Sequence, residues 1–152
     1  LMVAVGLVGF GWLHKLATDE KLRLPIIHHP AYSGGFVSPG VSGVADYLQL
    51  GLLPRIFGAD MPIFVSYGGR FTFTEKQCKR ISSYIKRPMG LMKAACPAPG
   101  GGVTDARLNE LVELYGNDTM FLVGGDMFRR GPDIEANMSY FVERLTKLSE
   151  RT

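Results

Sequence analysis

The chain has 152 residues, of which 46% are hydrophobic, and its 17 basic and 14 acidic residues give a net charge of +3. This composition is typical of one folded domain, or of part of one, and excludes a disordered polypeptide. The basic residues are scattered along the sequence, so they do not form the dense stripe that a nucleic-acid-binding protein needs.

Cysteine usage and the apolar opening bear on where the protein works. Cys78 and Cys96 lack the spacing of a metal site, and a single possible pair is a poor framework for a secreted fold. We therefore expect reduced thiols and a cytoplasmic protein. The opening LMVAVGLVGFGW lacks a basic leader and is too short to span a bilayer, which favours a buried strand and no membrane partner. Because the first residue is Leu1 and not Met, we expect a preceding segment that this sequence does not contain.

Short apolar stretches alternate with segments in which apolar residues recur at helical spacing, the pattern of a parallel sheet whose strands are joined by helices. The sequence predicts strands at Met2–Val5, Pro25–His28, Pro62–Ser66, Leu91–Cys96 and Thr119–Val123. It predicts helices at Trp12–Asp19, Gly43–Phe57, Glu75–Ile85, Asp105–Tyr115 and Ile134–Ser149. An eight-stranded barrel takes about 250 residues. Both a complete open doubly wound sheet and the last units of a barrel therefore fit the pattern.

Residues at the predicted helix ends support these boundaries. Thr74 and Thr104 each precede an acidic residue, which predicts a capping hydroxyl at the start of a helix. Gly58 and Gly116 stand where helices should end, because glycine accepts the left-handed conformation of a C-cap.

The loop after the second predicted strand carries adjacent histidines, His28 and His29. In parallel α/β folds such loops hold the active site, where an imidazole can bind a substrate hydroxyl or carry a proton. Neighbouring residues on a strand point to opposite faces, so only one of the two should meet a given ligand unless the strand has ended. The alternative is a histidine whose ring nitrogens are satisfied by nearby backbone.

The loop after the third predicted strand reads YGGRF and places Arg70 behind two glycines. The glycines free the backbone to fold over a ligand, and the guanidinium suits a phosphate or carboxylate. An ordinary loop with a solvated arginine is the alternative interpretation.

Glycines also follow the last two predicted strands, in PAPGGGVT and VGGD. Backbone N–H groups of such loops can hold an anion, and phosphate is frequently bound after the last two strands of a barrel. The candidate phosphate contacts are Gly101, Gly102, Gly124 and Gly125. Tight turns without a ligand remain the alternative for each loop.

Other motifs are absent from the sequence. It contains no phosphate-binding P-loop, no dinucleotide-binding glycine fingerprint after the first strand and no nucleophile elbow. Its aspartates, among them Asp46, Asp60, Asp118 and Asp126, do not have the spacing of a metal site.

Four segments, in their order and spacing, resemble the C-terminal half of the RuBisCO large-chain family: LPIIHHPAYSGG, LLPRIFGADMPIFVSYGGRF, PAPGGGVTDARLNELVELYGND and FLVGGDMF. The resemblance covers residues 1–152 and implies an α/β fold, a partial (β/α)8 TIM barrel made of strands 4 to 8 and their helices. The N-terminal domain and the first strands of the family are absent from this sequence.

The resemblance also implies roles for particular residues. His28 is similar to the fifth-strand histidine that contacts the substrate's hydroxyl region. Gly101 and Gly102 are similar to the seventh-strand phosphate contacts, and Gly124 and Gly125 to the eighth-strand amides that complete the phosphate site. The family stabilises an enediolate with Mg²⁺, whose ligands lie on the second barrel strand, so no metal ligand is expected in this chain.

Several positions depart from the carboxylases of the family. His29 replaces an arginine that binds the second phosphate, and Arg70 replaces the mobile lysine on which carboxylation depends. Ile63 replaces a phosphate-binding histidine, and Gly100 replaces a serine. Together these changes argue against a bisphosphate substrate and favour a non-carboxylating RuBisCO-like protein.

The resemblance therefore implies Mg²⁺-dependent enolisation of a phosphorylated, sugar-derived carbonyl compound by an enolase, isomerase or decarboxylase that forms a homodimer. The YGGRF and PAPGGG segments look more like the decarboxylating group, in which Arg70 would pair with a substrate carboxylate. The chain by itself is expected to be inactive. Two alternatives remain open, namely a non-catalytic half-barrel interaction module and a true ribulose-bisphosphate carboxylase.

Overall fold

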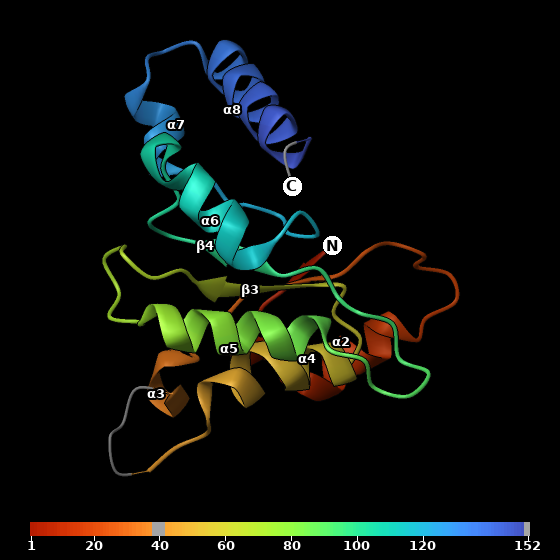
Figure 1. The fold of residues 1–152 in the computed structure, drawn as a ribbon. Coiled ribbons are helices and arrows are strands. Elements are labelled where there is room, and N and C mark those ends of the chain that lie inside the picture. The colour runs from red at the N-terminus through yellow and green to blue at the C-terminus, as the bar shows by residue number, and fades with distance from the viewer. Residues whose placement is uncertain (38–41, 151–152) are drawn as a thin grey trace.

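The computed structural model describes residues 1–37 and 42–150, and its centre is a parallel sheet (Figure 1). Its four strands lie in the order β1-β2-β3-β4 and are β1 (Met2–Val3), β2 (Ile27–His28), β3 (Met61–Val65) and β4 (Ala98–Gly100). Leu122 forms a parallel bridge to Gly100 and extends the sheet by one further position. Strands that follow one another in sequence are therefore neighbours in space.

Helices connect the strands: α1 (Val5–Val8), α2 (Phe10–Ala17), α3 (Gly34–Val37), the π-helix η1 (Leu48–Leu52), α4 (Leu53–Ile56), α5 (Glu75–Lys86), the 3-10 helix η2 (Asp105–Arg107), α6 (Leu108–Tyr115), α7 (Gly125–Arg129) and α8 (Ile134–Ser149). A doubly wound sheet reverses its strand order at a switch point, whereas this order runs in one direction. The predicted partial barrel is thereby confirmed. Within the described residues, no helix is long and apolar enough to cross a membrane.

The predicted fourth strand is wrong. Leu91 is fully exposed and Met92 pairs only with Met89 in an isolated antiparallel bridge, while the strand itself is Ala98–Gly100. Proline argues against a central strand because it lacks an N–H group, which made this segment look like a loop. Here the proline carbonyls carry the pairing, since Pro97 and Pro99 accept from the Met120 and Leu122 N–H groups at 2.9 and 3.1 Å.

Other boundaries also differ from the prediction. The predicted fifth strand shrinks to the single bridge at Leu122, and the predicted helix Gly43–Phe57 divides into η1 and α4, with Pro54 at the start of α4. The short helices α1, α3 and α7 were not predicted, because four or five residues carry too little periodicity to detect.

The capping predictions have mixed outcomes. Thr74 forms a capping box with Gln77 at the start of α5, as predicted. Gly58 and Gly116 follow helices with positive φ angles of 99° and 77°, also as predicted. The prediction for Thr104 is wrong, because its hydroxyl makes no capping hydrogen bond.

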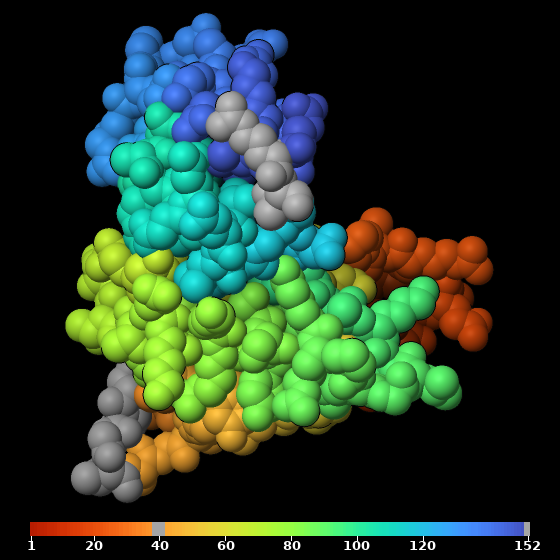
Figure 2. All heavy atoms as spheres, viewed as in Figure 1, coloured from red at the N-terminus to blue at the C-terminus, as the bar shows by residue number. Residues whose placement is uncertain are grey.

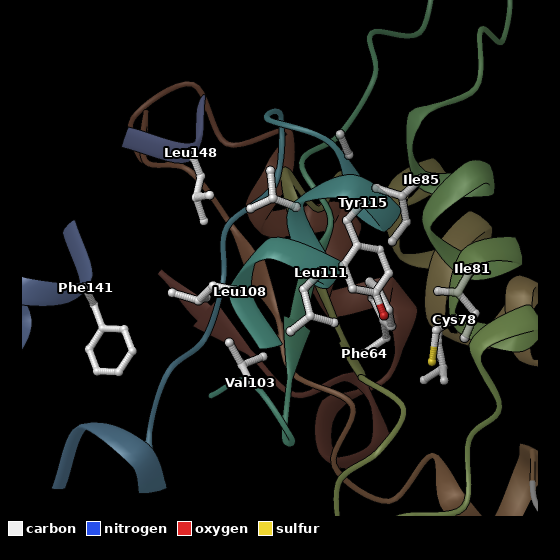
Figure 3. Packing of buried hydrophobic residues seen from close by; sticks show 13 residues of the cluster. Phe64, Cys78, Ile81, Ile85, Val103, Leu108, Leu111, Tyr115, Phe141 and Leu148 are labelled. Carbon is white, nitrogen blue, oxygen red and sulfur yellow. The ribbon is translucent and has the colours of Figure 1, made fainter. Parts of the chain in front are cut away.

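The largest core cluster lies between the sheet and the helices α5, α6 and α8 (Figure 3). Phe64 of β3 meets Tyr115 of α6 edge to face, with ring centroids 5.7 Å apart. Cys78 and Ile81 of α5 pack against the same pair, and both cysteines are free thiols. In the space-filling view the C-terminal segments, cyan and blue, stack on the green α5 region (Figure 2).

The two faces of the sheet differ in what covers them. Val3 of β1 and Ile26, just before β2, belong to a second core cluster with Leu13 of α2. The paired neighbours Met2, Ile27 and Met61 point to the opposite face, because side chains alternate along a strand. Met2 is 58% exposed there, whereas Ile63 and Ala98 on the same face are buried, so this face is open at β1 and covered at β3 and β4.

The buried side chain of Arg55 connects α4 with the segments that follow it. Its guanidinium donates to the carbonyls of Lys93, Met92, Arg87 and Tyr84 at 2.6–3.4 Å. These carbonyls belong to the C-terminal end of α5 and to the segment that leads into β4. One buried cation thus joins α4 to the next repeating unit of the fold.

Replacing Arg55 with Met should reduce the free energy of unfolding by about 3 kcal/mol, because several buried carbonyls lose a charged donor. Arg55→Lys should recover only part of this loss, since an ammonium cannot span the same carbonyls. Urea unfolding followed by circular dichroism measures both values. Lys79→Met, at an exposed position of α5, is the matched control and should change stability by less than about 0.5 kcal/mol. An Arg55→Met protein as stable as this control would contradict the role of the cation.

Candidate functional site

The loops that leave the carboxyl ends of the strands lie along one edge of the sheet, because all the strands are parallel. This edge carries all three groups of predicted site residues: the histidines after β2, the YGGRF loop after β3, and the glycines after β4 and Leu122. The loops after β3 and β4 touch directly. The β2 loop follows the neighbouring strand and, within the described residues, makes no backbone hydrogen bond to them.

The loops after β3 and β4 approach each other at glycine positions. A Cβ atom on Gly102 would lie 2.7 Å from the Gly69 nitrogen, and one on Gly69 would lie 2.9 Å from the Gly102 nitrogen. Gly102 also has a φ of +73°, a conformation that residues with side chains rarely adopt. The two main chains can therefore touch only because neither residue carries a side chain.

Arg107, at the end of η2, ties the same two loops together. Its Nη1 donates to the carbonyls of Tyr67 at 2.7 Å and Gly102 at 3.0 Å. Its remaining contacts are with Glu110 at 2.8 Å and with the face of the Tyr67 ring, whose centroid is 4.5 Å from the guanidinium carbon. The Tyr67 hydroxyl also donates to Glu110. Nothing in the local sequence marked Arg107, since an arginine at the start of a helix has many ordinary explanations.

Asp126 connects the third glycine loop to this pair. Its carboxylate accepts a hydrogen bond from the Asp105 N–H at 2.9 Å and caps η2 in place of the Thr104 hydroxyl. The Asp105 carboxylate is in turn held by the Tyr140 hydroxyl at 2.8 Å and Arg144 at 3.1 Å. These two partners lower the pKa of Asp105, with the Tyr140 hydrogen bond contributing most. Asp126 therefore joins the loop after Leu122 to the loop after β4, and Asp105 fixes the latter to α8.

Arg70 is the uncommitted cation of the site. It is exposed, lies over the ring of Phe71 at 4.8 Å, and makes no hydrogen bond or ion pair with any residue that the structure describes. A guanidinium with free donors at this edge can bind a phosphate or a carboxylate.

Gly124 and Gly125 stand at the start of α7, where a Cβ atom on either would meet nothing within 4 Å. Their backbone is therefore open to a ligand, whereas Gly102 is pressed against the neighbouring loop. Gly101 has a φ of +78° and is also exposed. The predicted phosphate contacts thus comprise one crowded and three accessible positions.

The two histidines differ in exposure. His28 shares its face with the core residue Ile26; it is completely buried, and within the described residues neither ring nitrogen has a hydrogen-bond partner. His29 directly follows β2, is exposed, and donates its N–H to the Val3 carbonyl at 2.8 Å. Its Nδ1 accepts from the Ala31 N–H at 3.1 Å, which leaves Nε2 as the ring donor of the neutral form. Of the two predicted histidines, only His29 is thus accessible in this structure.

No group of three or more His, Cys, Asp or Glu side chains gathers within residues 1–37 and 42–150. These residues do not by themselves form a divalent-metal site of the usual kind. The chemistry that they can supply is anion binding through backbone amides and Arg70, and proton transfer or hydrogen bonding through His29.

Comparison with curated proteins finds relatives that match most of this chain. "Ribulose bisphosphate carboxylase-like protein 1" of Rhodopseudomonas palustris is 32% identical over 93% of the chain and 36% of its own length. "2,3-diketo-5-methylthiopentyl-1-phosphate enolase" of Exiguobacterium sibiricum is 32% identical over 77% and 29%. "5-methylthioribulose-1-phosphate isomerase" of Rhodospirillum rubrum is 31% identical over 74% and 30%. The chain thus spans about a third of the length of these relatives.

Among solved structures, a rubisco-like protein from Alicyclobacillus acidocaldarius matches with a TM-score of 0.90 and 28% identity. The match covers 100% of this chain and 38% of that one. No protein-family model matches the sequence.

Replacing Gly124 with Leu should weaken the binding of inorganic phosphate at least tenfold and leave thermal unfolding unchanged, because the new side chain meets open space at a φ of −114°. Calorimetric titration of the full-length protein measures the affinity. Gly11→Leu, at another uncrowded glycine in α2, is the matched control and should bind phosphate normally. Unchanged affinity in Gly124→Leu would remove Gly124 from the site.

Acid should destabilise the fold through His28. Burial, reinforced by the charge of His29, lowers the pKa of His28 from 6.5 to about 4. Above pH 6.5 the imidazole is neutral in both states, whereas between pH 6.5 and 4 only the unfolded chain takes up the proton. The free energy of unfolding should therefore fall by about 3 kcal/mol across this range and then level off.

Urea unfolding at a series of pH values tests this dependence. His28→Gln should flatten the slope between pH 6.5 and 4, while His29→Gln, at the exposed neighbour, should retain it. Equal slopes in the wild-type and His28→Gln proteins would contradict the assignment.

Proposed function

This chain belongs to the RuBisCO large-chain family and is most like its RuBisCO-like proteins, and from that premise we propose that the polypeptide containing it enolises a phosphorylated, sugar-derived carbonyl compound. The observation that carries the proposal is the joined set of glycine loops at the carboxyl edge of the sheet, beside an unpaired arginine. In this proposal the chain supplies the anion-binding part of the active site.

The phosphate is held by backbone N–H groups of Gly101, Gly124 and Gly125, which are accessible and follow neighbouring strands. Gly102 contributes mainly by allowing the loops to meet. Amides held by the fold do not need to reorganise when an anion arrives, and this preorganisation strengthens their electrostatic effect.

Arg70 and His29 act on the rest of the substrate. Arg70 pairs with a second anionic group, a carboxylate if the reaction is a decarboxylation, and His29 donates from Nε2 to a substrate hydroxyl or carbonyl oxygen. The enolase and isomerase names of two relatives support a reaction that passes through removal of a proton next to a carbonyl. Enolase, isomerase and decarboxylase chemistry share the resulting enediolate.

Magnesium is part of the proposal through the family alone. The ion would stabilise the negative charge of the enediolate. The family resemblance places its ligands on the second barrel strand, outside this sequence. A homodimer and a cytoplasmic location likewise follow from the family resemblance and the cysteine content.

The proposal is tested on the full-length protein with Mg²⁺, by following exchange of substrate carbon-bound hydrogen with solvent deuterium. The substrates are 2,3-diketo-5-methylthiopentyl-1-phosphate, 5-methylthioribulose-1-phosphate and an oxo-sugar-acid phosphate. We expect exchange with one of them and a loss of about 10- to 100-fold in kcat/KM on Arg70→Met. Lys76→Met, at an exposed position of α5, is the control and should retain activity.

A folded protein that exchanges no hydrogen with any of these compounds would favour the non-catalytic interaction module instead. Incorporation of CO₂ into ribulose bisphosphate would make it a carboxylase despite Arg70.

A further inference from the structure

Two arginines near the same edge of the sheet have opposite environments. The Arg107 guanidinium donates hydrogen bonds to the Tyr67 and Gly102 carbonyls and pairs with Glu110, and its side chain is only 21% exposed. Arg70 is exposed and has no hydrogen-bond partner among the described residues. Arg107 is therefore committed to the protein, and Arg70 is available to a ligand.

Gly68 of the β3 loop lies directly against the guanidinium of Arg107. A Cβ atom on Gly68 would lie 2.5 Å from Nη1 and 2.9 Å from the guanidinium carbon of Arg107, and Gly68 has a φ of +75°. A side chain at this position would displace Arg107 from the two carbonyls that it joins. Gly68 makes room for the arginine, and Gly69 makes room for the opposite loop.

Three kinds of contact converge on the Arg107 side chain. Arg107 donates to both loops, stacks on the Tyr67 ring and pairs with Glu110, which also accepts from the Tyr67 hydroxyl. Tyr67 thus contacts Arg107 and Glu110 at the start of α6, and Gly69 packs against Gly102. Arg70 follows directly, so the position of its backbone is set by this fastening.

We propose that Arg107 is a positioning residue that holds the β3 loop against the β4 glycine loop and so sets the place of Arg70 relative to the phosphate-binding amides. The inference rests on the proposed function, since it gives Arg70 and these amides one substrate to share. It predicts that the loop is already in place before a ligand binds, so that a substrate with two anionic groups at a set spacing is selected.

Arg107→Met removes the fastening and fills a similar volume. Amide hydrogen exchange at Ser66, which is buried and donates its N–H to the Gly100 carbonyl at 2.8 Å where the two loops begin, should accelerate at least tenfold in the full-length protein, and the affinity for inorganic phosphate should fall severalfold. Arg107→Lys should restore part of the protection, because one ammonium can reach one of the two carbonyls. Arg144→Met is the matched control, since Arg144 also bridges elements of this region but, within the described residues, makes no hydrogen bond or ion pair with residues 67–69. It should leave exchange at Ser66 unchanged.

A double-mutant cycle distinguishes positioning from general support of the fold. With the active substrate, Arg70→Met should raise KM about tenfold in the wild-type background and by less than about twofold in the Arg107→Met background, because a mobile Arg70 no longer contributes. A tenfold effect of Arg70→Met in both backgrounds, or unchanged exchange at Ser66 in Arg107→Met, would overturn the inference. If Arg70→Met leaves the wild-type KM unchanged, the ligand role of Arg70 in the proposed function fails, and the exchange measurement still decides the role of Arg107.

Discussion

The site depends on the contact between two main chains, those of the loops after β3 and β4. Gly69 and Gly102 approach so closely that a Cβ atom on either would lie within 3.0 Å of the other's nitrogen. This approach brings the Tyr67 and Gly102 carbonyls within reach of one guanidinium, that of Arg107. Any side chain at the contact would push the loops apart, and Arg70 would move away from the glycine amides.

The elements behind this edge are held together by separate contacts. Helices pack on one face of the sheet around Phe64, and the buried guanidinium of Arg55 joins α4 to the end of α5 and to the segment before β4. Further along, Asp105 is held by α8 and by the Asp126 carboxylate. Polar groups with committed partners thus support the loops, while Arg70, His29 and Gly124 keep their ligand-binding groups free. This division agrees with an active site whose geometry is set before substrate arrives.

His28 and His29 are neighbours in sequence, but their imidazoles lie in different environments. His28 lies on the buried face of Ile26 and stays neutral because burial lowers its pKa, whereas His29 is exposed. The family resemblance places a ligand contact on His28, whose ring the structure buries. Strand alternation separates the two residues, but the sequence did not say which parity faces the helices, because both neighbouring positions, Ile26 and Ile27, are apolar.

The sequence by itself determined the alternation of strands and helices, the capping box at Thr74, the glycine helix ends and the family, since each depends on local periodicity or on residues at set spacing. It also brought forward the site loops, because glycines and an arginine after parallel strands must meet at one edge. Only the tertiary structure decided that β4 runs through prolines, that His28 is buried while His29 is exposed, and that Arg107 joins two loops. These features arise from contacts between residues distant in sequence, such as Arg107 with Tyr67, and local pattern carries no information about which distant carbonyl a side chain will reach.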